Sequence, residues 1–396
     1  MITDFNFLNE LSKVPEPKLF TLPVDCTGSM HIISLVEHEY FYIKVCVLLW
    51  KDQVRMGVSE GNMQEALHEV LKKVFHQEIT VVSCETKQMK GGTVGEITFL
   101  SGMATTEKGE KLPYKVVCKK QKKWERYGDP DSWRREYDLY KGNLDTAFSD
   151  SFRWPKCYAA EISDEETQIW MEYIDGVSGS DLTGEMYEQS ALELGRFQSR
   201  LYADKPEALS GLTNLSSKDF CKNFYYHYRS WNEVYDYIRA QDCEIPKHLC
   251  EMLIDLDERA QELWNEIEQL PVVLCHRDFW VANIFYSDQK IRLIDWDTAG
   301  FGYAGEDIAS LLADEADVAH MAENYKRCVK AYYRGFAEYS DVSHINYSYI
   351  KEFILFLFGY RLVEGIKFAE TQEEKRLQLY TLQKIYEIED EFEDRK

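Results

Sequence analysis

Three polar residues in the C-terminal half of the chain have the types and the spacing that phosphate chemistry requires. Asp278 and Asn283 lie five positions apart in the stretch Leu274-Cys-His-Arg-Asp-Phe-Trp-Val-Ala-Asn-Ile-Phe-Tyr286, and Asp295 follows in Leu293-Ile-Asp-Trp-Asp297. In a phosphoryl-transfer site, one carboxylate must reach the acceptor hydroxyl, while an amide and a second carboxylate hold the Mg²⁺ ions that neutralise the triphosphate. Two carboxylates and one amide in this order therefore favour such a site.

The apolar pattern around these residues predicts the elements that position them. Val272 to Leu274 form a short apolar run that leads into the first motif, and Ile284 and Phe285 lead out of it. Apolar residues then alternate from Ile291 to Ile294, as in a half-buried strand. We therefore expect two short strands, joined by residues 287–290, that bring the two motifs side by side.

Together with Gly305-Glu-Asp-Ile-Ala-Ser-Leu311, these motifs resemble the aminoglycoside phosphotransferase and choline kinase superfamily, relatives of protein kinases that phosphorylate small molecules. The resemblance implies that Asp278 is the catalytic base, that Asn283 and Asp295 are metal ligands, and that Asp307 is a structural carboxylate that braces the catalytic loop. The chain departs from the family in two places. Arg277 stands where the family usually has glycine, and Gln198 stands where it commonly has histidine.

The fold that the resemblance implies is α+β, a bilobal protein-kinase-like fold with a mixed, β-rich small N-lobe and a mostly helical C-lobe. We expect a nucleotide-binding small lobe over residues 61–175 and a catalytic, acceptor-binding lobe over residues 176–396, in which aromatic residues at helical spacing predict one helical face from Phe220 to Ile238. Residues 20–58 alternate in the manner of strands, and the resemblance does not cover residues 1–60. They are expected to form an N-terminal β extension.

Several residues of the small lobe are candidates for contact with ATP or GTP. Glycines let the backbone approach phosphate oxygens closely, which favours a nucleotide lid between two strands. In the family, a strand lysine contacts the phosphates and pairs with a helix glutamate, which here are Lys119 and Glu136. Because a strand has period two, Lys119 and its neighbour Lys120 point to opposite faces and only one can serve; Lys119 is preferred. The remaining candidates are the lid glycines Gly91, Gly92 and Gly95 and the hinge residues Met171 and Tyr173.

The acceptor is expected to be a small molecule, because Asp295 and Asp307 are twelve positions apart, too few for the long segment with which protein kinases hold a polypeptide. Acidic side chains beside aromatic ones suit a cationic acceptor such as an aminoglycoside or an amino alcohol. The candidate contacts are Asp314, Glu315, Glu364 and Trp280. A neutral sugar or nucleoside remains an alternative acceptor. A protein substrate, or a kinase-like binding protein without turnover, is the alternative function.

Composition limits the partners. The 46 lysines and arginines against 69 aspartates and glutamates give a net charge of −23, which repels nucleic acid and anionic membranes. The ten cysteines contain no Cys-x-x-Cys pair, which favours free thiols over a zinc site or disulfides. The N-terminus lacks the pattern of a signal peptide, and no apolar run is long enough to span a membrane. We therefore expect a cytoplasmic protein with a small-molecule substrate, a nucleotide and Mg²⁺; its oligomeric state is open.

Overall fold

The structure is a computed structural model that describes residues 60–89, 95–124, 126, 128–204, 207–228, 231–313, 316–345 and 347–389. The chain divides into two units, Met1–Glu60 and Gly61–Lys396, and the second is described here. The expected β extension over residues 1–60 lies outside the described residues, apart from Glu60.

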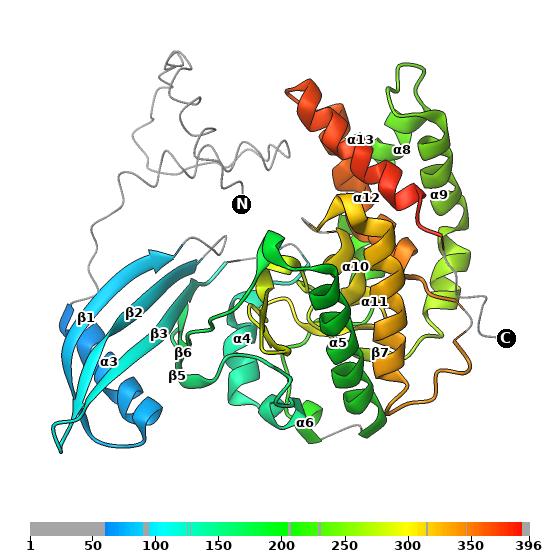
Figure 1. Ribbon diagram of the computed structural model, residues 1–396. Coiled ribbons are helices and arrows are strands. Elements are labelled where there is room, and N and C mark those ends of the chain that lie inside the picture. Colours follow the sequence, from blue (N-terminus) through cyan, green and yellow to red (C-terminus); the bar gives the residue numbers. More distant parts are fainter. Residues whose placement is uncertain are drawn as a thin grey trace, which may run out of the picture. The chain divides into compact units, whose positions relative to one another are not determined.

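The N-terminal part of this unit is a five-stranded antiparallel sheet with the order β1-β2-β3-β6-β5 (Figure 1). In β3, Tyr114, Val116 and Cys118 are buried on one face of the strand, as the period of two requires. The helix α3 covers this face, and the helix α4 contacts β3, β5 and β6. The elements are β1 (Ile79–Met89), β2 (Gly95–Thr106), β3 (Lys111–Lys122), β5 (Cys157–Ile162), β6 (Glu166–Glu172), α3 (Glu60–Phe75) and α4 (Ser132–Lys141).

The C-terminal part is mostly helical, and its central contact joins α5 (Gly184–Asp204) to α11 (Met321–Phe336). Two glycines allow this close approach. A Cβ atom on Gly195 would lie 2.1 Å from the carbonyl oxygen of Tyr332, and one on Gly335 would lie 2.2 Å from that of Leu192. Any side chain at either position would therefore force the two helix backbones apart.

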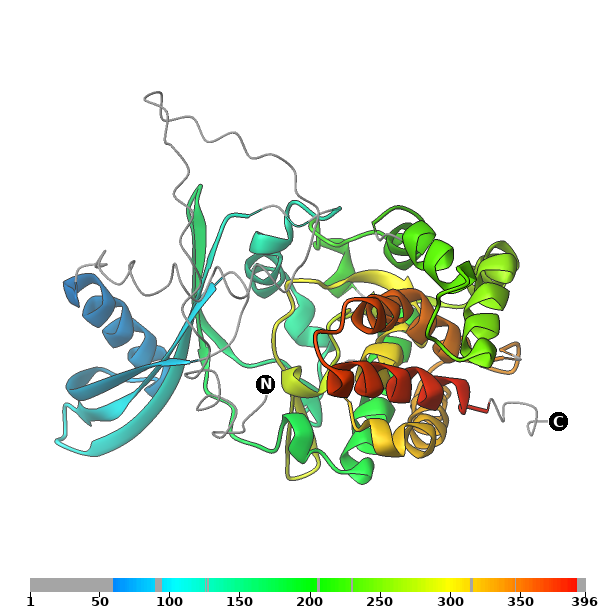
Figure 2. The same cartoon turned by 90° about the horizontal axis from the view of Figure 1, so that it is seen from above.

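Further helices complete this region, as seen from above in Figure 2. None of the helices in the described ranges is long and apolar enough to cross a membrane. The α-helices are α6 (Glu207–Ser210), α7 (Phe220–Asn223), α8 (Trp231–Arg239), α9 (Lys247–Ile267), α10 (Glu306–Ala313), α12 (Ile350–Lys367) and α13 (Gln372–Tyr386). The short turns are η2 (Leu144–Ala147), η3 (Gly179–Asp181), η5 (Val281–Asn283) and η6 (Val318–His320). This arrangement confirms the predicted α+β class.

In the described part of the aromatic segment from Phe220 to Ile238, the helix contains a π-helical turn that the spacing does not predict. The described part comprises α7, a π-helical turn η4 (Phe224–Tyr228) and α8. A π-helix bonds each residue to the fifth along the chain, so it rotates the face that follows it. Tyr225, which lies outside the predicted stripe, is 3% exposed and its ring contacts that of Trp231. The prediction that aromatic residues of this segment pack in the core is confirmed.

Two small sheets support the polar motifs. In the first, β7 (Val272–Cys275) pairs with β10 (Gly300–Tyr303). In the second, β8 (Ile284–Ser287) and β9 (Lys290–Leu293) form the predicted hairpin, and β4 (Phe152–Arg153) pairs with β9. The turn residues Asp288 and Gln289 have φ values of 50° and 60°, which is typical of a tight two-residue hairpin turn.

Candidate active site

The hairpin β8–β9 brings the three predicted chemical residues together. Its last strand pair is Ile284 with Leu293, so Asn283 and Asp295 emerge at the same end. The backbone N–H of Ile294 donates to the carbonyl oxygen of Asn283 at 3.0 Å. The side-chain amide of Asn283 donates to Asp278, at 2.8 Å to Oδ2 and 3.0 Å to the carbonyl oxygen. Two carboxylates and an amide from two motifs therefore share one site.

Asp307, at the start of α10, is 1% exposed. It lies beneath the loop at residues 276–283, which carries Asp278 and is the predicted catalytic loop. Its Oδ1 accepts the backbone N–H of Arg277 at 2.7 Å, and its Oδ2 accepts that of His276 at 2.9 Å. Burial raises the pKa of Asp307 to about 7, although these two N–H groups oppose the rise. The structure therefore places Asp307 where it holds the backbone that carries Asp278.

Gln198 on α5, which stands where the resemblance implies histidine, is a further support of this loop. The side chain is 1% exposed and donates to Asp307 Oδ2 at 2.9 Å and to the carbonyl oxygen of Leu274 at 3.0 Å. Its Oε1 accepts the hydroxyl of Tyr332 on α11 at 2.6 Å. A glutamine supplies two donors and an acceptor here, so it links α5, α11, α10 and the loop.

Arg277 adopts a left-handed backbone conformation, with φ of 65°, that glycine adopts more readily. Its side chain is 4% exposed and lies 3.5 Å from Glu306, which is 3% exposed. The guanidinium donates to Ser216 Oγ at 3.0 Å, to the carbonyl oxygen of Ser217 at 2.7 Å and to that of Phe301. These contacts compensate the unfavourable backbone conformation and fix the loop from its other side.

His276 supports Asp278 through a neutral ring. Its Nε2 lies 3.0 Å from the carbonyl oxygen of Ile294, and its Nδ1 accepts the backbone N–H of Asp278 at 3.2 Å. This pattern corresponds to the tautomer with the proton on Nε2. Burial lowers the pKa of His276 to about 4, so the ring stays neutral at physiological pH.

Lys119 is the strand lysine that reaches the site. Its Nζ lies 2.6 Å from Glu136 Oε2 and 2.5 Å from Asp295 Oδ1. Lys120 lies on the opposite face of β3. Burial alone would lower the pKa of Lys119, but the carboxylates of Asp295 and Glu136 outweigh burial and raise it. Conversely, Lys119 overcomes the effect of burial on Asp295 and lowers the pKa of that carboxyl group.

Asp297 differs from Asp295 in its surroundings. Its Oδ2 accepts from Gln121 Nε2 at 3.1 Å and lies 3.4 Å from Arg126 Nη2. The side chain of Asp297 is 11% exposed, whereas that of Asp295 is 31% exposed. Burial, followed by the nearby charge of Asp295, raises the pKa of Asp297. Asp295 is therefore the more accessible of the two carboxylates.

Arg135 on α4 is a site-supporting residue that the sequence did not single out. It is 1% exposed and forms a two-bond pair with Asp129, both bonds at 2.6 Å. It also donates to the carbonyl oxygens of Asp297 at 2.9 Å and Asn214 at 2.8 Å. Because it precedes Glu136, it holds α4 where Glu136 meets Lys119. Only its position beside Glu136 could have suggested this role.

The structure describes some of the other residues that are predicted to contact the nucleotide. Gly91 and Gly92 lie outside the described residues. Gly95 begins β2, where a Cβ would lie 2.6 Å from the carbonyl oxygen of Lys120, so glycine is needed for strand approach. Met171 is buried near the end of β6, and the ring of Tyr173, just beyond that strand, contacts Phe99 at 4.8 Å between centroids.

Two of the four acceptor candidates, Trp280 and Glu364, lie within the described residues. Asp314 and Glu315 lie outside the described residues. Glu364 lines a small hollow formed by α8 and α12, with no residue of the catalytic loop. Trp280 lies inside the loop, packs partly against the core, and its carbonyl oxygen accepts the N–H of Asn283 at 3.0 Å. Of the two candidates that the structure describes, Trp280 is the one that contacts Asn283.

Comparison with known proteins agrees with this geometry. Residues 134–339 match the APH family, described as the phosphotransferase enzyme family, over more than half of the chain. The chain belongs to this phosphotransferase family. The matched region contains Glu136, both polar motifs and Asp307, so the predicted resemblance is confirmed.

Individual relatives of the phosphotransferase family are more distant. Ethanolamine kinase 2 of Rattus norvegicus is 33% identical over 95 residues, which are 22% of this chain and 25% of that protein. The match thus spans about a quarter of this relative. An aminopropanol kinase associated with a microcompartment has a TM-score of 0.52 at 14% identity, covering 82% of this chain and 94% of that one. The GDP complex of an aminoglycoside 2′-phosphotransferase has a TM-score of 0.50 at 16% identity, covering 82% and 97%. These two structures share the fold.

The neutral ring of His276 predicts a specific dependence of stability on pH. Its pKa is about 4 in the folded state against 6.5 ordinarily, so between these values the unfolded chain binds more protons. This contribution to stability is complete above pH 6.5 and is lost as the pH falls towards 4. Replacing His276 with Gln removes the titration. The free energy of unfolding of the wild type, minus that of His276→Gln, should fall by about 1 kcal/mol between pH 7 and 5.5. Urea unfolding of both proteins measures it, and a difference independent of pH would contradict the neutral assignment.

Proposed function

We propose that this protein is a phosphotransferase that moves the γ-phosphoryl group of ATP, or of GTP, to a hydroxyl group of a small molecule. The observation that carries the proposal is the joint placement of Asp278, Asn283 and Asp295, with Lys119 bonded to Asp295. In this proposal, Asp278 accepts the proton of the acceptor hydroxyl. A carboxylate that is partly exposed and held by Asn283 is suited to that step.

The residues present fit Mg²⁺. The ion prefers oxygen ligands and usually takes one or two carboxylates together with water and substrate phosphates. Asp295 offers a partly exposed carboxylate, and Asn283 turns its amide nitrogen to Asp278, which leaves its side-chain oxygen for a metal. When bound, Mg²⁺ would neutralise charge on the phosphates.

Lys119 would serve the nucleotide in the same site. Its cationic form is stabilised by two carboxylates, and Glu136 holds it from the side of α4. In this structure its Nζ is bonded to Asp295. A triphosphate with its metal ion would compete for both partners, so we propose that nucleotide binding redistributes these bonds.

A small acceptor is supported by the segment between Asp295 and Asp307. Residues 300–303 are taken up by β10, which pairs with β7, and α10 begins at Glu306. The described chain therefore leaves no room for a long substrate-binding segment between the two residues. We propose that the acceptor is a cationic alcohol, because the matched relative acts on ethanolamine and because the net charge of −23 attracts cations.

The test is to incubate the protein with labelled ATP or GTP, Mg²⁺ and a panel of matched alcohols. We expect phosphorylation of amine-bearing alcohols such as ethanolamine, choline or aminoglycosides, with kcat/KM falling as salt is added. Neutral partners of the same size, such as ethylene glycol, sugars and nucleosides, should be poorer substrates. Equal kcat/KM for charged and neutral acceptors would overturn the cationic assignment. Absence of transfer to any hydroxyl compound, together with nucleotide binding, would favour a binding protein without turnover.

Asp278→Asn should reduce kcat by about 10²- to 10⁴-fold, because the variant loses the group that accepts the hydroxyl proton. Nucleotide affinity should change little, since in this proposal the carboxylate faces the acceptor. Single-turnover kinetics and nucleotide titration measure the two quantities separately. Turnover within a few-fold of the wild type would show that another group is the base.

Asp295→Ala should weaken Mg²⁺-dependent nucleotide binding much more than Asp297→Ala does. The reason is that Asp295 is accessible, whereas Asp297 is engaged by Gln121 and Arg126. Titrating nucleotide at several Mg²⁺ concentrations ranks the two variants, and the unfolding midpoint of each controls for damage to the fold. The opposite ranking would move the metal site to Asp297.

A further inference from the structure

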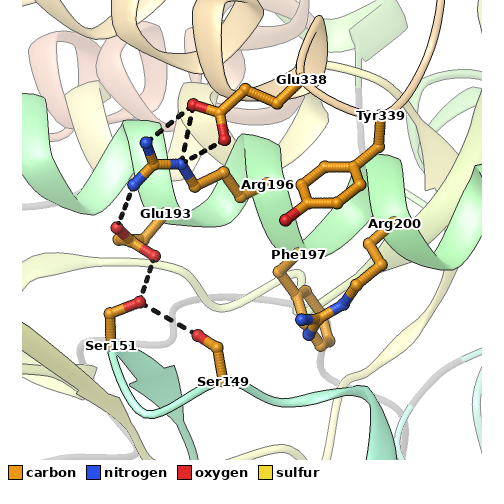
Figure 3. A pocket seen from close by; sticks show the side chains of 8 residues that line it. All are labelled: Ser149, Ser151, Glu193, Arg196, Phe197, Arg200, Glu338 and Tyr339. Atoms are coloured by element: carbon orange, nitrogen blue, oxygen red, sulfur yellow. Dashed lines mark hydrogen bonds and ion pairs between the residues drawn. The ribbon is translucent and has the colours of Figure 1, made fainter.

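A pocket of about 210 Å³ lies between α5, the turn at residues 149–151 and the end of α11 (Figure 3). It contains none of the residues assigned to the nucleotide, the metal or the acceptor. Four of its residues lie at spacings of three and four along α5 and so share one helix face. The lining residues are Ser149, Ser151, Glu193, Arg196, Phe197, Arg200, Glu338 and Tyr339.

The acidic groups of the pocket are already committed. Glu193 is 3% exposed and accepts from Ser151 Oγ at 2.7 Å and from Arg196 Nη1 at 2.7 Å. Glu338 receives Nε and Nη2 of the same Arg196, at 2.9 Å and 2.7 Å. Ser151 gives its proton to Glu193, so it accepts that of Ser149, 3.0 Å away. One connected chain of bonds thus uses both carboxylates and both hydroxyls (Figure 3).

Two donors remain. Within the described part of the chain, neither the guanidinium of Arg200 nor the hydroxyl of Tyr339 has a bonding partner. Figure 3 shows both side chains at the same end of the pocket as the ring of Phe197. Tyr339 is 47% exposed, so its ring and hydroxyl are accessible to a ligand. The pocket can therefore still donate hydrogen bonds to a ligand from the guanidinium of Arg200 and from the hydroxyl of Tyr339, next to the ring of Phe197.

We propose that this pocket is a second binding site, for a small ligand that carries a carboxylate or a phosphate. The guanidinium of Arg200 would donate two parallel hydrogen bonds to two oxygens of the ligand, because its planar geometry matches both carboxylate and phosphate. The hydroxyl of Tyr339 would donate a further hydrogen bond. The aromatic rings would contact an apolar part of the ligand. The two arginines and two glutamates balance in charge, so affinity depends on this short-range donation and we expect it to be modest.

Benzoate and benzamide test the site as a matched charged and neutral pair. Benzoate should bind the wild type, and benzamide should bind at least about tenfold more weakly, as expected for loss of a charge-assisted bond. Arg200→Gln should weaken benzoate binding by about tenfold or more, and Tyr339→Phe by a smaller factor. Arg376→Gln, which removes the same charge from an exposed position on α13, should leave binding unchanged. Chemical-shift titration gives each affinity, and unfolding midpoints confirm that the variants are folded.

Inorganic phosphate distinguishes the two anions. Because Lys119 also offers a cation to phosphate, each titration is repeated in Lys119→Met and in Arg200→Gln. Binding that persists in Lys119→Met and is lost in Arg200→Gln belongs to this pocket and supports a phosphate ligand. If benzoate binds in Lys119→Met but not in Arg200→Gln, and phosphate does not bind in this way, the result supports a carboxylate ligand. Equal benzoate affinity for Arg200→Gln and wild type, equal affinity for benzoate and benzamide, or no binding of either anion overturns the proposal. None of these outcomes depends on phosphotransferase activity.

Discussion

The candidate active site depends on the buried carboxylate of Asp307 and the two backbone N–H groups that it accepts, from His276 and Arg277. The loop that it holds contains a non-glycine residue with φ of 65°, a conformation that costs about 1–3 kcal/mol and persists only where the surroundings enforce it. Gln198 adds a third bond to Asp307. Without this anchor, the loop would relax, and Asp278 would no longer lie beside Asn283.

A second constraint joins the five-stranded sheet to the segment that follows the hairpin β8–β9. Lys119 on β3 bonds to Asp295, Gln121 on the same strand bonds to Asp297, and Arg135 on α4 bonds to the backbone of Asp297. All three bonds converge on the segment that begins after β9. Buried ion pairs contribute little net stability, but removing one partner leaves an uncompensated charge, so they fix geometry more than they strengthen the fold. Here that geometry fixes the position of Asp295 relative to the sheet, and in the proposed function it would set where a nucleotide meets Asp278.

Local patterns in the sequence predict much of this arrangement, but they do not predict which residues far apart in the chain contact one another. The hairpin at residues 284–293 is readable because apolar alternation and a two-residue turn are local. The π-helical turn after α7 is not, since it leaves no mark in residue spacing. The supporting roles of Gln198 and Arg135 could not be predicted, because the sequence alone does not distinguish a buried polar residue from an exposed one. Only the folded structure shows that they contact Asp307 and Asp297. The functional roles of all the predicted site residues stay predictions, and Gly91, Gly92, Asp314 and Glu315 also lie outside the described residues.

The helix α5 serves the catalytic loop and the proposed anion pocket at once. Gln198 reaches Asp307 and the backbone of Leu274, whereas Arg196 and Arg200 line the pocket. Phe197, between them, lies 6.1 Å from the ring of Trp296, which separates Asp295 from Asp297 and lies 4.6 Å from the ring of His276. A packed core transmits small displacements because it has few voids to absorb them. A ligand that shifted α5 would therefore act on the segment that contains Asp295 and on the loop that contains Asp278 together, since both rest on neighbouring residues of one helix.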